Sequence, residues 1–599
     1  MRTLVLAALL VWAGRAAAAD LAFAPCPGAP GVGCATLDVP LDHSGAVPGA
    51  IGLHVERRSA VGRQRGTLVV LAGGPGQGTS RVIGAGALAQ LADLFRGYAI
   101  VLVDPRGTGR SGVLRCAWPP AGSEEGSAAA VAACAARLGG ARGLYATRDA
   151  AADLEAVRAA LGAERLALYG TSYGTKLAQA YALAYPNRAE RLLLDSALST
   201  GWEVAGTTSL QAAPRLLREL CAAVACPRGA GDLAARLVRV ASRLGARPRV
   251  VAAVAPDGRR DRRLVLDGAT PFDLLVASDL NPALRALLPG AVTLADRGDL
   301  RGLARLAALQ ADAPRGAATR FSLALFTTVL CEEGAFPWER TAPVEGREAA
   351  LEAALAAVPD AVLGPFGRWA AARTDLQVAG YCLSWPQTPI APTLAAGPLP
   401  DVPVLVVQGR LDVRTPLELA RRVAAQFPQA RVLAVRGTGH SVLSPAEPCV
   451  EDAVRDWLAG RAVAAGCEGY GSWLAATAPP PARLAAIPSR GGLPARVART
   501  VAAVRLTLAD AALAGLASLL QGGRAPVGGL AAGVLRPSWT TFALERYAVV
   551  AGVELSGRLE LLGTELVGRV RVSGAAAAAG ELRVDGAGIS GTLAGTAVG

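Results

Sequence analysis

A serine, a carboxylate and a histidine follow one another along this sequence in an order that suits nucleophilic hydrolysis. Ser172 stands in Gly170-Thr171-Ser172-Tyr173-Gly174, between a run of β-forming residues and a helical stretch. On such a strand-to-helix elbow the hydroxyl is exposed, and it becomes a good nucleophile when an imidazole takes its proton. His43 and His54 precede Ser172, so His440, in the loop after a later strand candidate, is the expected base. The pattern predicts acyl transfer through Ser172.

Two aspartates compete to orient the imidazole. Asp412 follows a strand-like run in Gly409-Arg410-Leu411-Asp412, which matches the chain order Ser, acid, His of a strand-to-helix elbow. Asp195 ends another expected strand, and a carboxylate there could also reach the ring. Chain order and loop position favour Asp412, whose other role would be to cap a helix that begins near Thr415.

Two backbone N–H groups are expected to bind the negative charge that develops on the substrate oxygen. One belongs to Tyr173, the residue after the nucleophile. The other is assigned to Gly74 in Ala72-Gly73-Gly74-Pro75-Gly76, where glycines let the backbone approach the substrate closely. This chemistry needs neither a metal nor an organic cofactor, and we expect none.

Strand and helix patterns alternate in the segments that carry these residues, which predicts a mostly parallel sheet covered on both faces. Strands are expected at 35–41, 51–57, 67–71, 99–103, 166–169, 191–194, 402–408 and 431–435. Helices are expected at 149–161, 172–185, from 415 onward and at 445–458. Between these parts, residues 201–399 have an almost purely helical pattern, which predicts a helical cap inserted into the sheet.

The N-terminus and the cysteines indicate an exported protein. Arg2 precedes an apolar stretch that is too short to span a bilayer, and Ala17-Ala18-Ala19 offers a signal-peptide cleavage site near Ala19. The even number of cysteines, 10, fits structural disulfides in an oxidising compartment, with neighbour pairing as the simplest of several connectivities. No C-x-x-C spacing indicates a metal site. The cysteines are Cys26, Cys34, Cys116, Cys134, Cys221, Cys226, Cys331, Cys382, Cys449 and Cys467.

Composition excludes several classes of protein. With 52% hydrophobic residues the chain has enough apolar content for sizeable cores, which excludes a wholly disordered protein. Its length of 599 residues excludes a single small domain. The net charge of +13 comes almost entirely from singly scattered arginines, since Lys176 is the only lysine. We therefore expect no nucleic-acid partner.

A Pro- and Gly-rich boundary near 475–494 separates these segments from a different C-terminal region. A helix is expected at 497–520, followed by an alternating tail with glycine turns that predicts a small β-rich module. The apolar run of this helix is broken by Asp510 and is shorter than the ~20 residues of a membrane span. We expect a packed helix and no transmembrane segment in the mature chain; the oligomeric state stays open.

Four motifs together carry a family resemblance. They are Gly73-Gly74-Pro75-Gly76, Asp104-Pro105-Arg106-Gly107-Thr108-Gly109-Arg110-Ser111, the elbow followed by Thr175, and Gly409-x-x-Asp412-x-x-Thr415-Pro416. In combination they resemble secreted α/β-hydrolase peptidases of the proline iminopeptidase and tripeptidyl aminopeptidase (TAP-like) group, over residues 36–467. The resemblance implies an α/β-hydrolase fold whose helical insertion caps the cleft. It also implies a serine exopeptidase for peptides with free N-termini, with Ser172, Asp412 and His440 as its triad.

An aminopeptidase needs a carboxylate to recognise the free α-ammonium group. Cys331-Glu332-Glu333 and Cys382-Leu383-Ser384-Trp385-Pro386 resemble the family's Cys-x-Glu and Cys-x-x-Trp-Pro stretches, whose cysteines would tie the cap beside the cleft. The resemblance makes Glu333 the candidate amine anchor. The alternative is a solvated glutamate near a helix end.

The predicted organisation has six segments: a signal peptide (1–19), a hydrolase core in two parts (20–200 and 400–470), a helical cap (201–399), a linker (471–495) and a helix with a β-rich module (496–599). Two other functions stay open. A carboxylesterase of the same fold would use the same triad, because the triad does not distinguish an ester from an amide. A non-catalytic protein that binds the cell envelope through its tail would need no triad.

Overall fold

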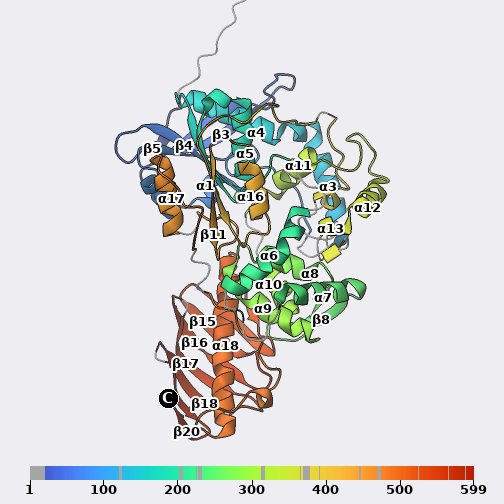
Figure 1. Cartoon of the computed structure of the whole chain (residues 1–599), viewed down its shortest axis with the longest axis vertical. Coiled ribbons are helices and arrows are strands. Elements are labelled where there is room, and N and C mark those ends of the chain that lie inside the picture. The colour runs from blue at the N-terminus through green and yellow to red at the C-terminus, as the bar shows by residue number, and fades with distance from the viewer. Residues whose placement is uncertain are drawn as a thin grey trace, which may run out of the picture.

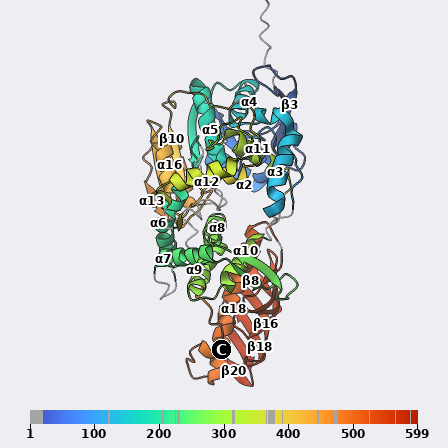
Figure 2. The ribbon, with the colours of Figure 1, turned by 90° about the vertical axis from the view of Figure 1, so that its right-hand side faces the viewer.

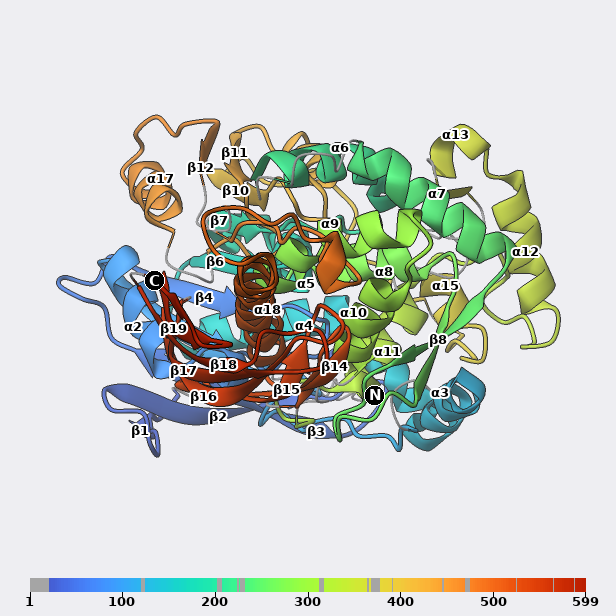
Figure 3. The same ribbon diagram turned by 90° about the horizontal axis from the view of Figure 1, so that it is seen from below.

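The structure is a computed structural model of the whole chain, viewed along three axes in Figures 1 to 3. It describes residues 21–119, 124–201, 207–223, 226, 232–311, 317–363, 366–367, 378–389, 391–443, 447–468, 474–523, 525–563, 565–586 and 588–599. The expected signal peptide, residues 1–19, lies outside the described residues.

A ten-stranded sheet forms the centre of the larger part of the molecule (Figure 1). Its strand order is β1-β2-β3-β5-β4-β6-β7-β10-β11-β12, with antiparallel pairing from β1 to β5 and parallel pairing from β5 onward. The strands are β1 (Ala24–Pro25), β2 (Val32–Pro40), β3 (Ala50–Arg58), β4 (Gly66–Leu71), β5 (Tyr98–Val103), β6 (Leu166–Thr171), β7 (Ala189–Asp195), β10 (Val404–Gly409), β11 (Ala430–Arg436) and β12 (Gly466–Glu468). Each strand expected from the sequence is present, and the prediction of a mostly parallel sheet is confirmed.

Helices cover both faces of this sheet, because its central strands carry apolar side chains on both sides. On one face α4, α5 and α16 pack against residues such as Val69 and Leu168, and on the other α2 and α17 pack against residues such as Val70 and Leu405. The core helices are α1 (Thr79–Val82), α2 (Ala85–Leu94), α3 (Glu124–Leu138), α4 (Thr147–Ala160), α5 (Tyr173–Ala184), α16 (Leu417–Ala424) and α17 (Pro448–Leu458).

The cap between β7 and β10 is mainly helical, but the expectation of an almost purely helical segment is wrong at one place. Strands β8 (Arg249–Ala253) and β9 (Arg262–Leu266) form an antiparallel hairpin. The β-branched pair Val250 and Val251 favours a strand, and Gly258 takes the positive φ of +87° that the turn requires. The cap helices are α6 (Thr207–Ala223), α7 (Leu233–Ala246), α8 (Thr270–Ala277), α9 (Pro282–Asp296), α10 (Arg301–Ala311), α11 (Leu323–Glu333), α12 (Arg347–Ala357), α13 (Asp360–Leu363) and α15 (Val378–Tyr381).

The C-terminal region is an eight-stranded antiparallel sheet with α18 (Ala495–Leu520) along one face, as Figure 3 shows. Strands follow one another in chain order, and the expected β-rich module is confirmed. They are β13 (Val527–Gly528), β14 (Ala532–Pro537), β15 (Thr541–Ala548), β16 (Glu554–Leu562), β17 (Glu565–Ser573), β18 (Gly580–Asp585), β19 (Gly588–Leu593) and β20 (Thr596–Val598).

Among the described helices, α18 alone is long and apolar enough to cross a membrane, and 67% of its most apolar window is buried inside the protein. Figure 2 shows α8, α9 and α10 of the cap between the core and the module. A buried network joins the cap to the C-terminal module. Arg305 on α10 binds Asp510 on α18 at 2.6 Å, and Tyr547 on β15 donates to the same carboxylate at 2.6 Å. The segment expected as a linker also packs there, with Leu484 and Ile487 buried and the Thr477 N–H bonded to the Ala286 carbonyl.

All ten cysteines are paired, and each bond joins neighbours in the sequence, as the simplest connectivity predicts. The pairs are Cys26–Cys34, Cys116–Cys134, Cys221–Cys226, Cys331–Cys382 and Cys449–Cys467. Such bonds persist in oxidising compartments, so they support an extracellular or periplasmic location.

Candidate active site

Ser172 occupies a strained turn between β6 and α5. Its backbone has φ +56° and ψ −121°, a conformation that non-glycine residues rarely adopt. The flanking glycines are required by close packing, because a Cβ on Gly170 would lie 2.3 Å from the Gly174 carbonyl oxygen and one on Gly174 would lie 2.1 Å from the Leu71 carbonyl oxygen. The G-x-S-x-G run therefore forms the sharp elbow that presents the hydroxyl at the carboxyl edge of the sheet.

His440 and Asp412 are in direct contact at the same edge. The Nδ1 atom of His440, after β11, lies 2.9 Å from Oδ2 of Asp412, after β10. Thr415 donates from its N–H (2.9 Å) and its hydroxyl (2.7 Å) to the same carboxylate, and Gln408 donates its side-chain amide at 2.9 Å. These donors hold the buried carboxylate in one orientation toward the imidazole.

The Asp412–His440 pair has the electrostatics of an acid that supports a base. Burial favours the neutral carboxyl, but the charge and hydrogen bond of His440 and the donors from Thr415 outweigh it, so the pKa of Asp412 lies below its usual 3.8. Burial also disfavours the imidazolium, but Asp412 outweighs that effect and raises the pKa of His440 above 6.5. His440 is thus a stronger base than a free imidazole.

The rival carboxylate, Asp195, has a different set of partners. It accepts hydrogen bonds from the backbone N–H groups of Val442 (2.8 Å) and Leu443 (2.9 Å), just after His440. Burial raises its pKa above the usual value. Of the two candidate acids, Asp412 contacts the imidazole and Asp195 holds the backbone of the histidine loop.

Ser172 lies at the edge where these loops meet. Thr171 is in register with Asp195, which is in register with Val407 on β10. The Ser172 N–H donates to the Asp195 carbonyl at 2.9 Å, and the N–H of Ser441 donates to the Ser196 hydroxyl at 2.8 Å. Within the described residues no hydrogen bond joins the Ser172 hydroxyl to His440; in a ligand-free enzyme this bond often tightens only with substrate.

The expected oxyanion donors are available. In the described part of the chain, the N–H groups of Gly74 and Tyr173 have no hydrogen-bond partner, whereas the Gly73 N–H donates to Oε1 of Gln77 at 2.9 Å. A Cβ on Gly73 would lie 2.9 Å from the Cβ of Ser172, so this loop contacts the nucleophile directly. Gly74 has φ +108°, which a glycine adopts without strain. The N–H groups of Gly74 and Tyr173 are thus not used by another described acceptor, and the loop that holds Gly74 contacts Ser172 through Gly73.

The candidate amine anchor Glu333 is buried beside α5. Its carboxylate binds the Lys176 ammonium at 2.8 Å and accepts a hydrogen bond from the Thr147 N–H at 2.5 Å. Burial lowers the pKa of Lys176, and the charge of Glu333 only partly opposes this effect. Glu333 therefore already has a cationic partner, which a substrate amine would have to displace or share.

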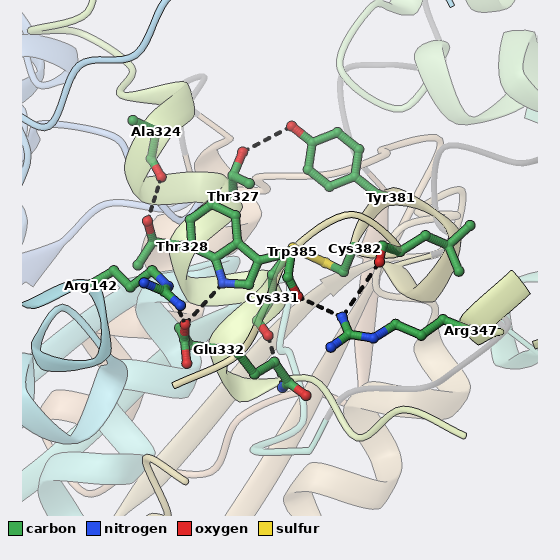
Figure 4. The surroundings of a disulfide bond; sticks show 12 residues. Arg142, Ala324, Thr327, Thr328, Cys331, Glu332, Arg347, Tyr381, Cys382 and Trp385 are labelled. Carbon is green, nitrogen blue, oxygen red and sulfur yellow. Dashed lines mark hydrogen bonds and ion pairs between the residues drawn. A yellow bond between two sulfur atoms is a disulfide. The ribbon is translucent and has the colours of Figure 1, made fainter. Parts of the chain in front are cut away.

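Glu332, the neighbouring acid, is part of a cap network around the Cys331–Cys382 bond (Figure 4). Its carboxylate accepts hydrogen bonds from the Trp385 indole at 2.9 Å and from Arg142 at 3.1 Å, and it binds Arg340 at 2.5 Å. These donors fully occupy the buried carboxylate of Glu332, which thus ties the two cysteine motifs of the cap together.

Sequence reasoning missed Asp279, a buried cap residue between α8 and α9 that contacts both triad loops. Its Oδ2 accepts the N–H groups of Val413 and Arg414 at 3.0 Å each, and its carbonyl accepts the N–H of His440 at 3.2 Å. Burial and the charge of Asp412 raise the pKa of Asp279 to about 7. No local motif marks this residue, since its partners are more than a hundred positions away in the chain.

Two family models match segments of this chain, and several known proteins are similar to it. The family model described as "alpha/beta hydrolase fold" matches residues 66–270, and the model described as "TAP-like protein" matches residues 367–465. A tripeptidyl aminopeptidase of Streptomyces lividans is 27% identical over 467 residues, which span 71% of this chain and 81% of that protein. Serine protease Hip1 of Mycobacterium tuberculosis is 27% identical over 464 residues, spanning 71% and 85%. A solved epoxide hydrolase from an endophytic Streptomyces is 17% identical, covers 73% of this chain and 99% of its own, and has a TM-score of 0.34.

Proposed function

The chain is a serine hydrolase of the α/β-hydrolase fold with a TAP-like region and peptidase relatives, and from that premise we propose that it is an exported aminopeptidase. It releases residues or short peptides from free N-termini through an acyl-enzyme. The serine chemistry is supported above all by the 2.9 Å contact between Asp412 and His440 at the sheet edge that carries the strained Ser172 elbow. The choice of peptides as substrates is supported by the peptidase relatives.

In the proposed mechanism Ser172 attacks the scissile carbonyl carbon while Nε2 of His440 takes the hydroxyl proton. Asp412 orients the imidazole and stabilises the imidazolium that forms. The N–H groups of Gly74 and Tyr173 bind the oxyanion, a contribution of ~3–4 kcal/mol for one donor in serine enzymes. His440 then protonates the leaving amine as the C–N bond breaks. Water next attacks the acyl-enzyme carbonyl while His440 takes its proton, and His440 returns that proton to the Ser172 oxygen as the acyl bond breaks and the acid is released.

We assign the substrate amine to Glu333. A substrate ammonium beside this carboxylate would share it with Lys176, whose pKa is lowered by burial so that its proton is more easily lost. The variant Glu333→Gln tests this assignment. It should raise KM for substrates with a free amine and leave KM for N-blocked substrates unchanged, whereas a merely structural role would lower stability and impair both substrates alike.

The decisive experiment compares three substrates of the full-length mature protein: an aminoacyl arylamide, its N-blocked form and a short-chain p-nitrophenyl ester. Because charge-assisted hydrogen bonds are worth ~1.5–3 kcal/mol, blocking the amine should lower kcat/KM by about 10- to 100-fold. Equal turnover of the free and blocked amides would contradict the aminopeptidase assignment. Efficient hydrolysis of the ester alone would make the protein a carboxylesterase.

A fluorophosphonate probe provides the control for enzyme identity. The folded protein should form an adduct at Ser172, and the Ser172→Ala variant should form none. Absence of the adduct in the unmodified protein would favour the non-catalytic envelope binder. Sequencing the N-terminus of protein recovered from outside the cytoplasm tests the export proposal, for which we expect cleavage near Ala19.

A further inference from the structure

A cavity of about 620 Å³ lies beside the nucleophile and has walls from three parts of the chain. Gly73, Thr171 and Ser441 contribute the wall next to the triad, since the first two contact or precede Ser172 and the third follows His440. The cap contributes Arg320 and Phe321. The volume of the cavity lies within the ~300–1,000 Å³ of small-molecule sites, which is enough for a short peptide segment.

The third wall comes from the C-terminal module. Leu520, Gln521 and Gly522, at the end of α18, line this cavity, and the Leu520 side chain is 41% exposed. The two family matches cover residues 66–270 and 367–465, so this wall lies outside the segments that the chain shares with those family models. A region that neither family model covers thus borders the catalytic edge.

Hydrogen bonds to the cap hold this end of α18 in place. Asn281 donates from its side-chain amide to the Ala517 carbonyl at 2.8 Å, and Gln521 donates to the Gln310 side chain at 2.7 Å. About two turns further back along α18, the buried Arg305–Asp510 pair fixes the helix against α10. Because the wall is anchored, it can exclude or contact a bound molecule rather than move away from it.

The charges that face the cavity suit an anion. Glu451 is already bonded to the Gln90 side chain at 2.6 Å and to Arg455 at 3.0 Å. Arg320 is exposed and has no ion-pair partner among the described residues. A free α-ammonium would be repelled by this guanidinium, whereas a carboxylate would be attracted. Glu333, the candidate for the amine, does not line this cavity.

We propose that this cavity binds the part of a peptide that leaves after cleavage, with the end of α18 as its outer wall and Arg320 as the group that binds a carboxylate. The proposal rests on the proposed aminopeptidase function and adds a role for the C-terminal module. The carboxylate is either the C-terminus of a short peptide or an Asp or Glu side chain in the leaving segment. The end of α18 therefore selects substrates by length, and Arg320 of the cap selects them by charge.

A ladder of peptides tests the charge. The peptides share one amino-terminal part, carry one to four residues after the scissile bond, and are made as free acids, as carboxamides and as carboxamides with one glutamate in the leaving segment. At one or more lengths the carboxylate should raise kcat/KM by about two- to fivefold, the effect of a solvent-accessible ion pair. Arg320→Met should abolish this preference, and Arg297→Met, which changes an exposed cap arginine outside the cavity, should keep it.

The free acids and the glutamate carboxamides distinguish the two sources of carboxylate, and a preference for either supports the proposal. It is overturned if the unmodified enzyme ignores the carboxylate at every length. A preference that survives in Arg320→Met would also overturn it.

A second pair of variants tests the wall. Leu520→Trp should lower kcat/KM by about tenfold for the longest peptides and much less for a small arylamide, because added volume in a packed subsite is costly. Leu562→Trp is the matched control, since Leu562 is 59% exposed on β16 and does not line the cavity. Identical behaviour of the two variants along the ladder would refute a role for α18.

The proposed function and this inference fail in different ways. If the unmodified protein cleaves no peptide but labels at Ser172, the aminopeptidase assignment is wrong, and the wall is then tested by labelling rates with a small and a bulky fluorophosphonate. Selective slowing of the bulky probe by Leu520→Trp would still support the wall. Equal slowing of both probes, or none, would overturn it.

Discussion

Strands β5 and β10 of the ten-stranded sheet are buried at every position, whereas β18 of the eight-stranded sheet alternates between buried and exposed residues. The first sheet is mostly parallel and covered by helices on both faces, so the loops of its parallel strands converge at their carboxyl edges. The second is an antiparallel meander with α18 on one face. The contrast is one of arrangement: the parallel strands bring side chains from distant segments together, and the helix packed on the antiparallel sheet ends at the cavity beside them.

The largest expected effect is on kcat, and it should arise from the nucleophile at the ten-stranded sheet and not from a serine of the eight-stranded sheet. Ser172→Ala should lower kcat by about 10⁴- to 10⁶-fold, because nucleophile and base act as a unit. Steady-state and single-turnover kinetics on an aminoacyl arylamide measure the loss. Ser590→Ala, an exposed serine on β19, is the control and should leave kcat unchanged. Retained activity in Ser172→Ala would assign the reaction to another residue.

A second prediction compares the two aspartates of the parallel sheet. Asp412→Asn should lower kcat by about 10⁴-fold, since the amide no longer stabilises the correct imidazole tautomer. Asp195→Asn should mainly lower stability, by about 1–3 kcal/mol, because a backbone N–H after His440 loses its acceptor. Kinetics and thermal unfolding of both variants check this assignment, and the reverse ranking in kcat would make Asp195 the acid.

The contact between the module and the cap should be sensitive to one buried charge. Asp510→Ala leaves the buried Arg305 guanidinium without its carboxylate, and should lower the free energy of unfolding by about 3–5 kcal/mol. Calorimetry measures the change. Glu581→Ala removes a 70% exposed acid from β18 and should have little effect. Equal effects of the two substitutions would argue against a buried network at this contact.

The smallest of these expected effects is the dependence of kcat/KM on pH. His440 accepts a proton only when neutral, and its pKa is raised above 6.5, so kcat/KM should fall as the pH is lowered through a midpoint above 6.5. A pH profile of kcat/KM locates this midpoint. An acid limb below pH 6.5 would mean that Asp412 does not stabilise the imidazolium in the free enzyme.

Local patterns in the sequence determined most of the fold and the elbow. The strands at 166–171 and 404–409 were predictable because continuous β-forming apolar runs are typical of parallel strands buried on both faces. The elbow was predictable because Gly170 and Gly174 stand where any side chain would collide with backbone. The hairpin at 249–266 was missed because its alanine- and arginine-rich surroundings hide the Val250–Val251 strand signal.

Only the tertiary structure decided which side chains share the site. Asp195 and Asp412 both lie at the carboxyl edge of the sheet, on neighbouring strands or just after them. The sequence alone therefore could not determine which carboxylate reaches His440. Asp279 and Leu520 come to the site through the packing of the cap and of α18, and no period or motif in their own segments encodes those contacts. Hydrophobic periodicity reports only whether a residue faces a core, whereas the site depends on which elements pack together across hundreds of residues.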